Sequence, residues 1–274
     1  MIKHRLVYSY WIGNEFSDIH KLHLRLLGIY NYIFDSIDLI ILYEDENDIE
    51  NTKANILSYI NREDINFICI KNDPLYREGI VYKKFIIDRL NDFETNELVF
   101  FGHSKGVSNP LNLTNKENTR YWISIMYWGN LEKPYIVDDE LLVKDNVCFG
   151  SVYNYDSSSL VKYKWQYAGA FQWINPKRLY NLIKDTYTDT LYTDHMIMRI
   201  AEEFLGNNVP TDKAAFINHQ WFNKKHSLLL YEPSYYTYYK VMHLACSFMS
   251  IDDTYEFIDF ININNLLDET SDNI

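Results

Sequence analysis

The chain has 274 residues, of which 47% are hydrophobic and 23% charged, as is usual for a globular protein with a sizeable core. Its formal net charge of −12 creates a negative mean field that repels polyanions, so DNA or RNA is disfavoured as the main partner. The three cysteines, Cys69, Cys148 and Cys246, are widely spaced and form no Cys-x-x-Cys pair, so neither a disulfide framework nor a zinc knuckle is expected.

Residues 1–12 lack the apolar core of a signal peptide, and no apolar run reaches about eighteen residues, the length of a membrane span. We therefore expect no transmembrane segment and a cytoplasmic location, in a bacterium or in a host cell. Aromatic residues are unusually frequent, with 24 Tyr, 15 Phe and 6 Trp. Their faces can stack on sugars or bases, although most must belong to the core.

Short apolar runs alternate with helical patterns in residues 1–109. We expect strands over Leu6–Ile12, over Asp38–Tyr43, over Asn66–Ile70 and from Glu97 onward. The helices expected between them run from an N-cap at Ser17 to about Phe34, over Asn51–Ile60 and over Gly79–Asn91. Strands separated by helices predict βαβ units and a mainly parallel sheet flanked by helices, here a nucleotide-binding α/β half.

The pattern becomes mixed after residue 109. We expect a helix near Asn118–Asn130, strands over Val147–Tyr153 and Gln166–Ile174, and helices over Pro176–Lys184 and Met196–Leu205, the last ending at Gly206. The acidic Asp138-Asp139-Glu140 follows Pro134 and is expected to be a solvated loop, with metal ligation as the less favoured alternative. Because no linker or repeat interrupts the chain, we predict one domain over 1–274, with a second half at 110–213 and a Tyr-rich extension at 214–274.

The fourth expected strand ends abruptly in a polar tip, His103-Ser104-Lys105-Gly106. In parallel α/β sheets ligands sit at the carboxyl ends of the strands, so His103 and Lys105 are expected to be presented at a site. A solvated turn is the alternative reading of the same residues. Neither GxGxxG nor GxxxxGK[ST] occurs, which removes the usual dinucleotide and P-loop hypotheses.

Three segments carry a resemblance when they are taken together: FFGHSKGVSN (Phe100–Asn109), WQYAGAFQWINPKRLYNL (Trp165–Leu182) and MRIAEEFLGN (Met198–Asn207). In this order they resemble the landmarks of a group of small GT-A-type glycosyltransferases of bacteria and viruses. Those landmarks are an H-[ST/D]-K-G-like strand tip, a GNFWW-like strand and an A-E-x-x-[IL]-G-like stretch. The resemblance spans about residues 5–207. It departs at Ala170 and Gln172, which replace the usual Asn and Trp.

The resemblance implies a GT-A-like domain that moves a sugar from a nucleotide-sugar, most simply a UDP-sugar, to a hydroxyl acceptor on a glycan or similar substrate. This reaction needs positive charge at the diphosphate and a carboxylate near the acceptor hydroxyl or the sugar. Many such enzymes hold Mn²⁺ or Mg²⁺ with an Asp-x-Asp where this chain has His103-Ser104-Lys105. Lys105 can pair with the phosphates directly, and His103 can be a phosphate donor or a metal ligand. We therefore expect reduced or absent metal dependence.

Carboxylates in the third segment are the candidates for the general base. Glu202 and Glu203 are adjacent on an expected helix, so only one of them can face a cleft. The resemblance favours Glu202, with Glu203 as its competitor. Asp194 is another candidate, unless it is simply a helix N-cap. Arg199 can bind phosphate or form an intrahelical ion pair.

Aromatic residues and their neighbours supply the candidate pocket. Gly169 lets the backbone approach a ligand, and the next expected strand places Phe171 and Trp173 on one side and Gln172 on the other. One of these two sides is expected to line a sugar and acceptor pocket, unless Trp173 belongs to the core. A nucleotide base is expected near the end of the first strand, where Tyr10 or Trp11 can stack on it or simply pack, in the sequence Tyr8-Ser9-Tyr10-Trp11.

Two other functions stay open. The chain can be a catalytically silent nucleotide- or carbohydrate-binding module that kept the fold. It can also be a phage or viral enzyme that glycosylates modified DNA bases, which predicts a local basic groove that includes Lys162, Lys164, Lys177 and Arg178.

Overall fold

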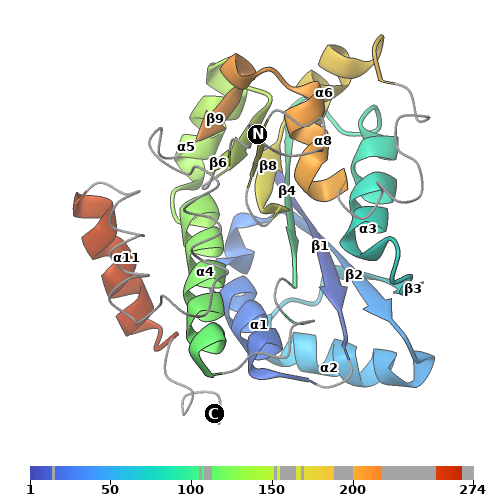
Figure 1. The fold of residues 1–274 in the computed structure, drawn as a ribbon. Helices are drawn as coiled ribbons and strands as arrows, with labels where there is room; N and C mark the ends of the chain where they lie inside the picture. Colours follow the sequence, from blue (N-terminus) through green and yellow to red (C-terminus); the bar gives the residue numbers. More distant parts are fainter. Residues whose placement is uncertain are drawn as a thin grey trace.

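The protein folds around a seven-stranded sheet with helices on both faces, as seen in a computed structural model (Figure 1). The structure describes residues 1–13, 16–104, 107, 113–150, 153–154, 165–167, 170–187, 200–216 and 251–266. The strand order is β3-β2-β1-β4-β8-β5-β9, so strands from both halves of the chain join in one sheet.

The amino-terminal half alternates strictly between strand and helix. Its elements are β1 (Lys3–Trp11), α1 (Asp18–Tyr30), β2 (Ser36–Tyr43), α2 (Ile49–Tyr59), β3 (Ile65–Lys71), α3 (Arg77–Phe85) and β4 (Glu97–His103). β1 pairs with β2 and β4, and β2 pairs with β3, in every case in parallel. The predicted alternation and the mainly parallel sheet are therefore confirmed. α1 and α3 end earlier than expected, because 3₁₀ turns over Asn31–Ile33 and Ile87–Arg89 replace their last turns.

The second half completes the sheet and adds helices. Its elements are α4 (Leu113–Leu131), α5 (Pro134–Asp138), β5 (Cys148–Gly150), β6 (Tyr153–Asn154), β7 (Gln166–Tyr167), β8 (Gln172–Ile174), α6 (Pro176–Ile183), α8 (Ile200–Asn208), β9 (Ala214–Phe216) and α11 (Ile251–Ile263). β8 runs antiparallel to both neighbours, β4 and β5, whereas β5 and β9 are parallel. The sheet is thus mostly parallel with one reversed strand.

The expected strand over Gln166–Ile174 is two strands. Ala170 adopts a left-handed backbone conformation with φ of 55°, which turns the chain between them. β7 therefore leaves the main sheet and pairs with β6, while β8 enters the main sheet.

The expected loop at Asp138-Asp139-Glu140 is helical. Pro134 occupies the first turn of α5, where its missing N–H costs nothing, and Asp138 ends that helix. A π-helical turn over Asp139–Val143 follows. The carboxylates have partners within the protein, since Asp138 lies 2.7 Å from His4 Nε2 and both Asp139 and Glu140 pair with Lys144.

α8 continues past Gly206, where the sequence predicted its end. A Cβ at this position would lie 1.5 Å from the carbonyl oxygen of Trp165, so the helix backbone packs directly on β7. Glycine is needed here for that close approach rather than for a helix cap.

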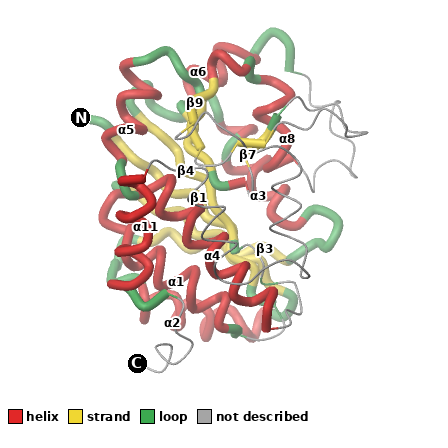
Figure 2. Tube along the Cα trace, turned by 60° about the vertical axis from the view of Figure 1, so that its left-hand side comes forward, coloured by secondary structure: helices red, strands yellow, loops and turns green. Residues whose placement is uncertain are grey.

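Two apolar layers enclose the sheet. Leu98 and Phe100 of β4 point toward α1 and α4, while Val99 and Phe101 point toward the other layer, which includes α3, α6 and α8. In Figure 1 α4 and α11 lie to the left of β1, α3 lies to its right and α8 lies above it; Figure 2 shows the strands between these helices from another side. None of the described helices combines the length and apolar character that a bilayer crossing requires.

The buried tyrosines predict a loss of stability at alkaline pH. Burial raises the pKa of Tyr8, Tyr10, Tyr30 and Tyr127 above the value of an exposed tyrosine. Because these pKa values are raised in the folded state, the stability is complete below the unfolded value of about 10 and decreases as the pH rises above it. Melting temperatures measured from pH 7 to 11 should be level up to about pH 9.5 and then fall. A level profile up to pH 11 would contradict this expectation.

Candidate functional site

The strand order reverses between β1 and β4. From β1 the chain crosses through α1 to β2 on one side, whereas β4 lies on the other side of β1. Such a topological switch point leaves a crevice at the carboxyl ends of the two strands, which is where open α/β sheets bind ligands. Trp11 ends β1 here, and His103 ends β4.

Ser104 ties the two strand ends together. Its backbone N–H donates to the carbonyl oxygen of Ser9 at 3.0 Å, and its Oγ accepts from the backbone N–H of Trp11 at 2.9 Å. The carbonyl oxygen of Trp11 is held as well, since His20 Nε2 lies 3.0 Å from it. Both backbone groups of Trp11 are thus held by side chains, and the polar tip is fixed against the end of β1.

His103 lies on the face of the sheet that α3 covers. Its side chain is 7% exposed, and its Nδ1 lies 3.9 Å from Oε1 of Glu78 in the first turn of α3. The imidazole ring lies near Phe101, at 6.4 Å between centroids, and near Phe171, at 5.7 Å. A carboxylate at this distance can attract the imidazole when the ring is protonated, and the pair then carries no net charge.

Glu78 was not a predicted site residue. The sequence gives little reason to select Glu78, because acidic residues are common in the first turn of a helix, where they interact favourably with the helix dipole.

The three aromatic residues at the end of β1 have different environments. Tyr8 is fully buried, with its hydroxyl 2.9 Å from both His23 Nδ1 and Tyr127 Oη. Tyr10 is also buried, on the α1 side of the sheet, in agreement with the packing alternative. Trp11 is partly exposed and packs on the α3 side, and its Nε1 is buried with no hydrogen-bond partner in the described part of the chain. Of the three, Trp11 is the one placed to meet a ligand.

The side chains of Phe171, just before β8, and of the β8 residues Gln172 and Trp173 alternate between the two faces as predicted, and all three are buried. Phe171 and Trp173 lie on the α1 and α4 side, where Trp173 Nε1 donates to the carbonyl oxygen of Asn130 at 2.8 Å. This environment corresponds to the core alternative for Trp173. Gln172 lies on the opposite side, and its Nε2 donates to Tyr82 Oη at 2.9 Å and to the carbonyl oxygen of Ala201 at 3.2 Å.

Backbone strain occurs beside the same region. Three residues other than glycine have positive φ in the described part of the chain: Arg77 (44°), Ala170 (55°) and Asn265 (48°). Arg77 precedes Glu78, and Ala170 precedes Phe171. Left-handed conformations of this kind cost about 1–3 kcal/mol each and often occur at functional sites.

α8 carries the carboxylates of the third motif. Glu203 is 2% exposed and lies one turn before Gly206, on the side of α8 that packs on β7. Glu202 belongs to the same helix, but its side chain lies outside the described residues. α8 packs against α3 and so occupies the same face of the sheet as His103.

Several predicted positions lie outside the described residues. They are Lys105, Gly106, Gly169, Asp194 and Arg199, together with Lys162 and Lys164 of the expected basic groove.

The two described members of that groove lie away from His103. Lys177 Nζ donates to the carbonyl oxygen of Asn91, which precedes β4, and Arg178 donates to the carbonyl oxygens of Leu142 and Asn146. Both therefore sit near the start of β4, at the opposite end of the sheet.

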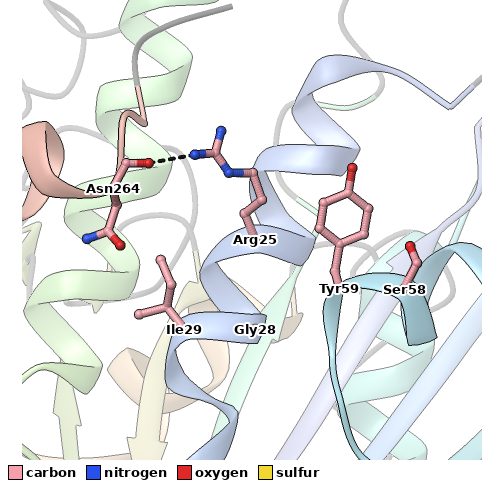
Figure 3. Close-up of a pocket in the computed structure, with 6 residues that line it drawn as sticks. All are labelled: Arg25, Gly28, Ile29, Ser58, Tyr59 and Asn264. Atoms are coloured by element: carbon pink, nitrogen blue, oxygen red, sulfur yellow. Dashed lines mark hydrogen bonds between the residues drawn. The ribbon is translucent and has the colours of Figure 1, made fainter. Parts of the chain in front are cut away.

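No cluster of three or more His, Cys, Asp or Glu side chains suited to a metal ion occurs among the described residues. A separate groove of about 470 Å³ lies on the outer side of α1 and is lined by Arg25, Gly28, Ile29, Ser58, Tyr59 and Asn264 (Figure 3). Because α1 covers the face opposite to α3, this groove is separate from the switch point.

Comparison of the sequence with models of known protein families gives no match, and comparison with curated proteins gives none either.

The tie between Ser104 and Trp11 yields a stability prediction. Replacing Ser104 with Ala leaves the backbone N–H of Trp11 without its acceptor, so the free energy of unfolding should fall by about 1–2 kcal/mol. Ser104→Thr keeps the hydroxyl and is the matched control. Urea unfolding of the three proteins measures the difference, and equal stabilities for wild type and Ser104→Ala would show that the bond contributes nothing.

Proposed function

We propose that the protein is a glycosyltransferase with a GT-A-like fold, which binds a nucleotide-sugar at the switch point and transfers the sugar to a hydroxyl acceptor. One observation carries this proposal: His103 and Ser104 are fixed beside Trp11 where the strand order reverses. Nucleotides bind at this position in doubly wound α/β sheets. The order β3-β2-β1-β4 of the first four strands also matches the amino-terminal part of such sheets.

Each step of the transfer has a candidate residue. Trp11 offers a partly exposed ring for the base, and His103 offers a ring N–H as donor to the diphosphate, with Lys105 two residues further along the chain. In the reaction the acceptor oxygen forms a bond to the anomeric carbon while the bond to the diphosphate breaks. The diphosphate leaves with the bonding electrons, and a carboxylate takes the proton of the acceptor hydroxyl.

The carboxylate is assigned to α8. Glu203 is the described candidate, since it is buried on the helix that packs on α3. A general base must reach the proton of the acceptor hydroxyl directly or through one water molecule, and this role is what the proposal asks of the carboxylate on α8. Glu202 keeps its place as the alternative at the next position.

Binding and turnover test the proposal together. UDP should raise the melting temperature more than GDP, CMP or dTDP, because a ligand that binds only the folded state stabilises it by mass action. Incubation with a panel of nucleotide-sugars should then release free nucleoside diphosphate. His103→Gln should weaken UDP binding, while Tyr32→Ala, a change at an exposed residue, should not. Binding without turnover of any donor would favour the silent module instead.

Metal dependence is a separate prediction from the strand tip. Because His103-Ser104-Lys105 stands where an Asp-x-Asp is usual, transfer should keep most of its rate in EDTA. The measurement compares initial rates in EDTA with rates after addition of Mn²⁺ or Mg²⁺. Complete loss in EDTA with full recovery on adding either ion would show that this enzyme uses a metal after all.

A further inference from the structure

Gln172 joins three elements through one buried side chain. It projects from β8 beside Phe101 of β4, and its exposed fraction is 0%. Its Nε2 donates one hydrogen bond to Tyr82 of α3 and one to the carbonyl oxygen of Ala201 in α8. The amide group therefore connects the sheet to both helices that cover this face.

The orientation of this amide is determined by its partners. Turning it over would bring Oε1 against the carbonyl oxygen of Ala201, and two acceptors cannot bond to each other. In the observed orientation both N–H groups are used, and Oε1 is buried without a hydrogen-bond partner in the described part of the chain.

The surroundings of Gln172 are largely apolar, apart from the Tyr82 hydroxyl and the Ala201 carbonyl oxygen that its amide contacts. The ring of Tyr82 lies 4.9 Å from that of Phe101 and 6.2 Å from that of Phe204. A leucine of similar volume would remove the unpaired Oε1, but it would also remove the donor of the hydrogen bond that the buried Tyr82 hydroxyl accepts, and leaving a buried polar atom unpaired costs about 1–3 kcal/mol. In some proteins a buried polar group of this kind specifies a unique arrangement of the elements around it while adding little stability, and Gln172 is a candidate for this role.

The elements that Gln172 connects carry the candidate site. α3 contributes Glu78, which lies 3.9 Å from His103, and α8 carries Glu203. The amide of Gln172 forms its hydrogen bonds with Tyr82 of α3 and Ala201 of α8, and not with Glu78, His103 or Glu203. It can therefore act on the site only through the distance between α3, which carries Glu78, and α8, which carries Glu203.

We propose that Gln172 is a positioning residue: its two hydrogen bonds fix α8 relative to α3 and so place the carboxylate of Glu203 for the transfer reaction. The catalytic part of this inference rests on the proposed function. This role differs from direct contact with the sugar, in which Oε1 would accept a hydrogen bond from a ligand hydroxyl.

Hydrogen exchange tests the structural part without any substrate. In Gln172→Leu the amides of α8 should exchange about tenfold faster than in the wild type, while those of α6 should not change. Ser124→Ala is the matched control, because its buried hydroxyl donates only within α4, to the carbonyl oxygen of Arg120. Unchanged exchange in α8 would overturn the inference. If Gln172→Leu does not fold, Tyr82→Phe, which removes one of the two bonds, should show a smaller increase in α8, and no increase would overturn the inference in the same way.

Kinetics test the catalytic part. Gln172→Leu should lower kcat about tenfold with little change in the KM for the donor, since the ground-state contacts of the donor remain. If Gln172 acts through Glu203, the double variant Gln172→Leu/Glu203→Gln should be as slow as Glu203→Gln alone, within about twofold. Losses that multiply in the double variant would overturn the proposal and place Gln172 in contact with the ligand.

The two parts can fail separately. If the wild type turns over no nucleotide-sugar, the proposed function fails, and the exchange of α8 still decides whether Gln172 fixes this helix. If the wild type is active and the exchange of α8 is unaffected by Gln172→Leu, the positioning role fails while the proposed function stands.

Discussion

The pairing between the ends of β1 and β4 is the constraint on which the candidate site depends. Parallel strands keep their register through evenly spaced hydrogen bonds, but these normally stop where the strands stop. Here Ser104 extends the pairing by one step, and His20 holds the carbonyl oxygen of Trp11. The backbone at the switch point is therefore fixed before any ligand arrives, and fixed groups lose little entropy on binding.

The two faces of the sheet bury different sets of polar groups. On the α1 and α4 side the hydroxyl groups of Tyr8 and Tyr127 and the ring of His23 contact one another, while the buried hydroxyl of Tyr10 has no hydrogen-bond partner in the described part of the chain. On the α3 and α8 side the polar groups include Trp11 Nε1 and Gln172 Oε1, which have no hydrogen-bond partners in the described part of the chain. The strained Arg77 adjoins Glu78, which faces His103 on the same side. Unpaired buried polar atoms therefore occur on both faces, and the face with α3 and α8 is distinguished by the contact between Glu78 and His103.

The sequence predicted the elements well wherever one periodic pattern spans a whole element. The alternation of strands and helices from Lys3 to His103 follows from apolar spacing, which depends only on neighbours in the chain. The errors occur where a contact distant in sequence decides the outcome. Gly206 was predicted to end the helix, but glycine is required there by the close approach of the backbone of Trp165, 41 residues earlier in the chain. The expected strand is divided at Ala170 because β7 pairs with β6 and β8 pairs with β4. The choice of sheet for each part cannot be predicted from the apolar spacing of the neighbouring residues.

The sequence by itself determined the α/β class, the parallel direction of the first strands and the position of the polar tip at the end of β4. It also separated Phe171 and Trp173 from Gln172, because side chains alternate along a strand. Only the tertiary structure decided which polar groups meet: Glu78 beside His103, Ser104 on Trp11, and Gln172 between Tyr82 and Ala201. The physical reason is that periodicity fixes the direction of a side chain within its own element, whereas its partners are set by the packing of elements far apart in the chain.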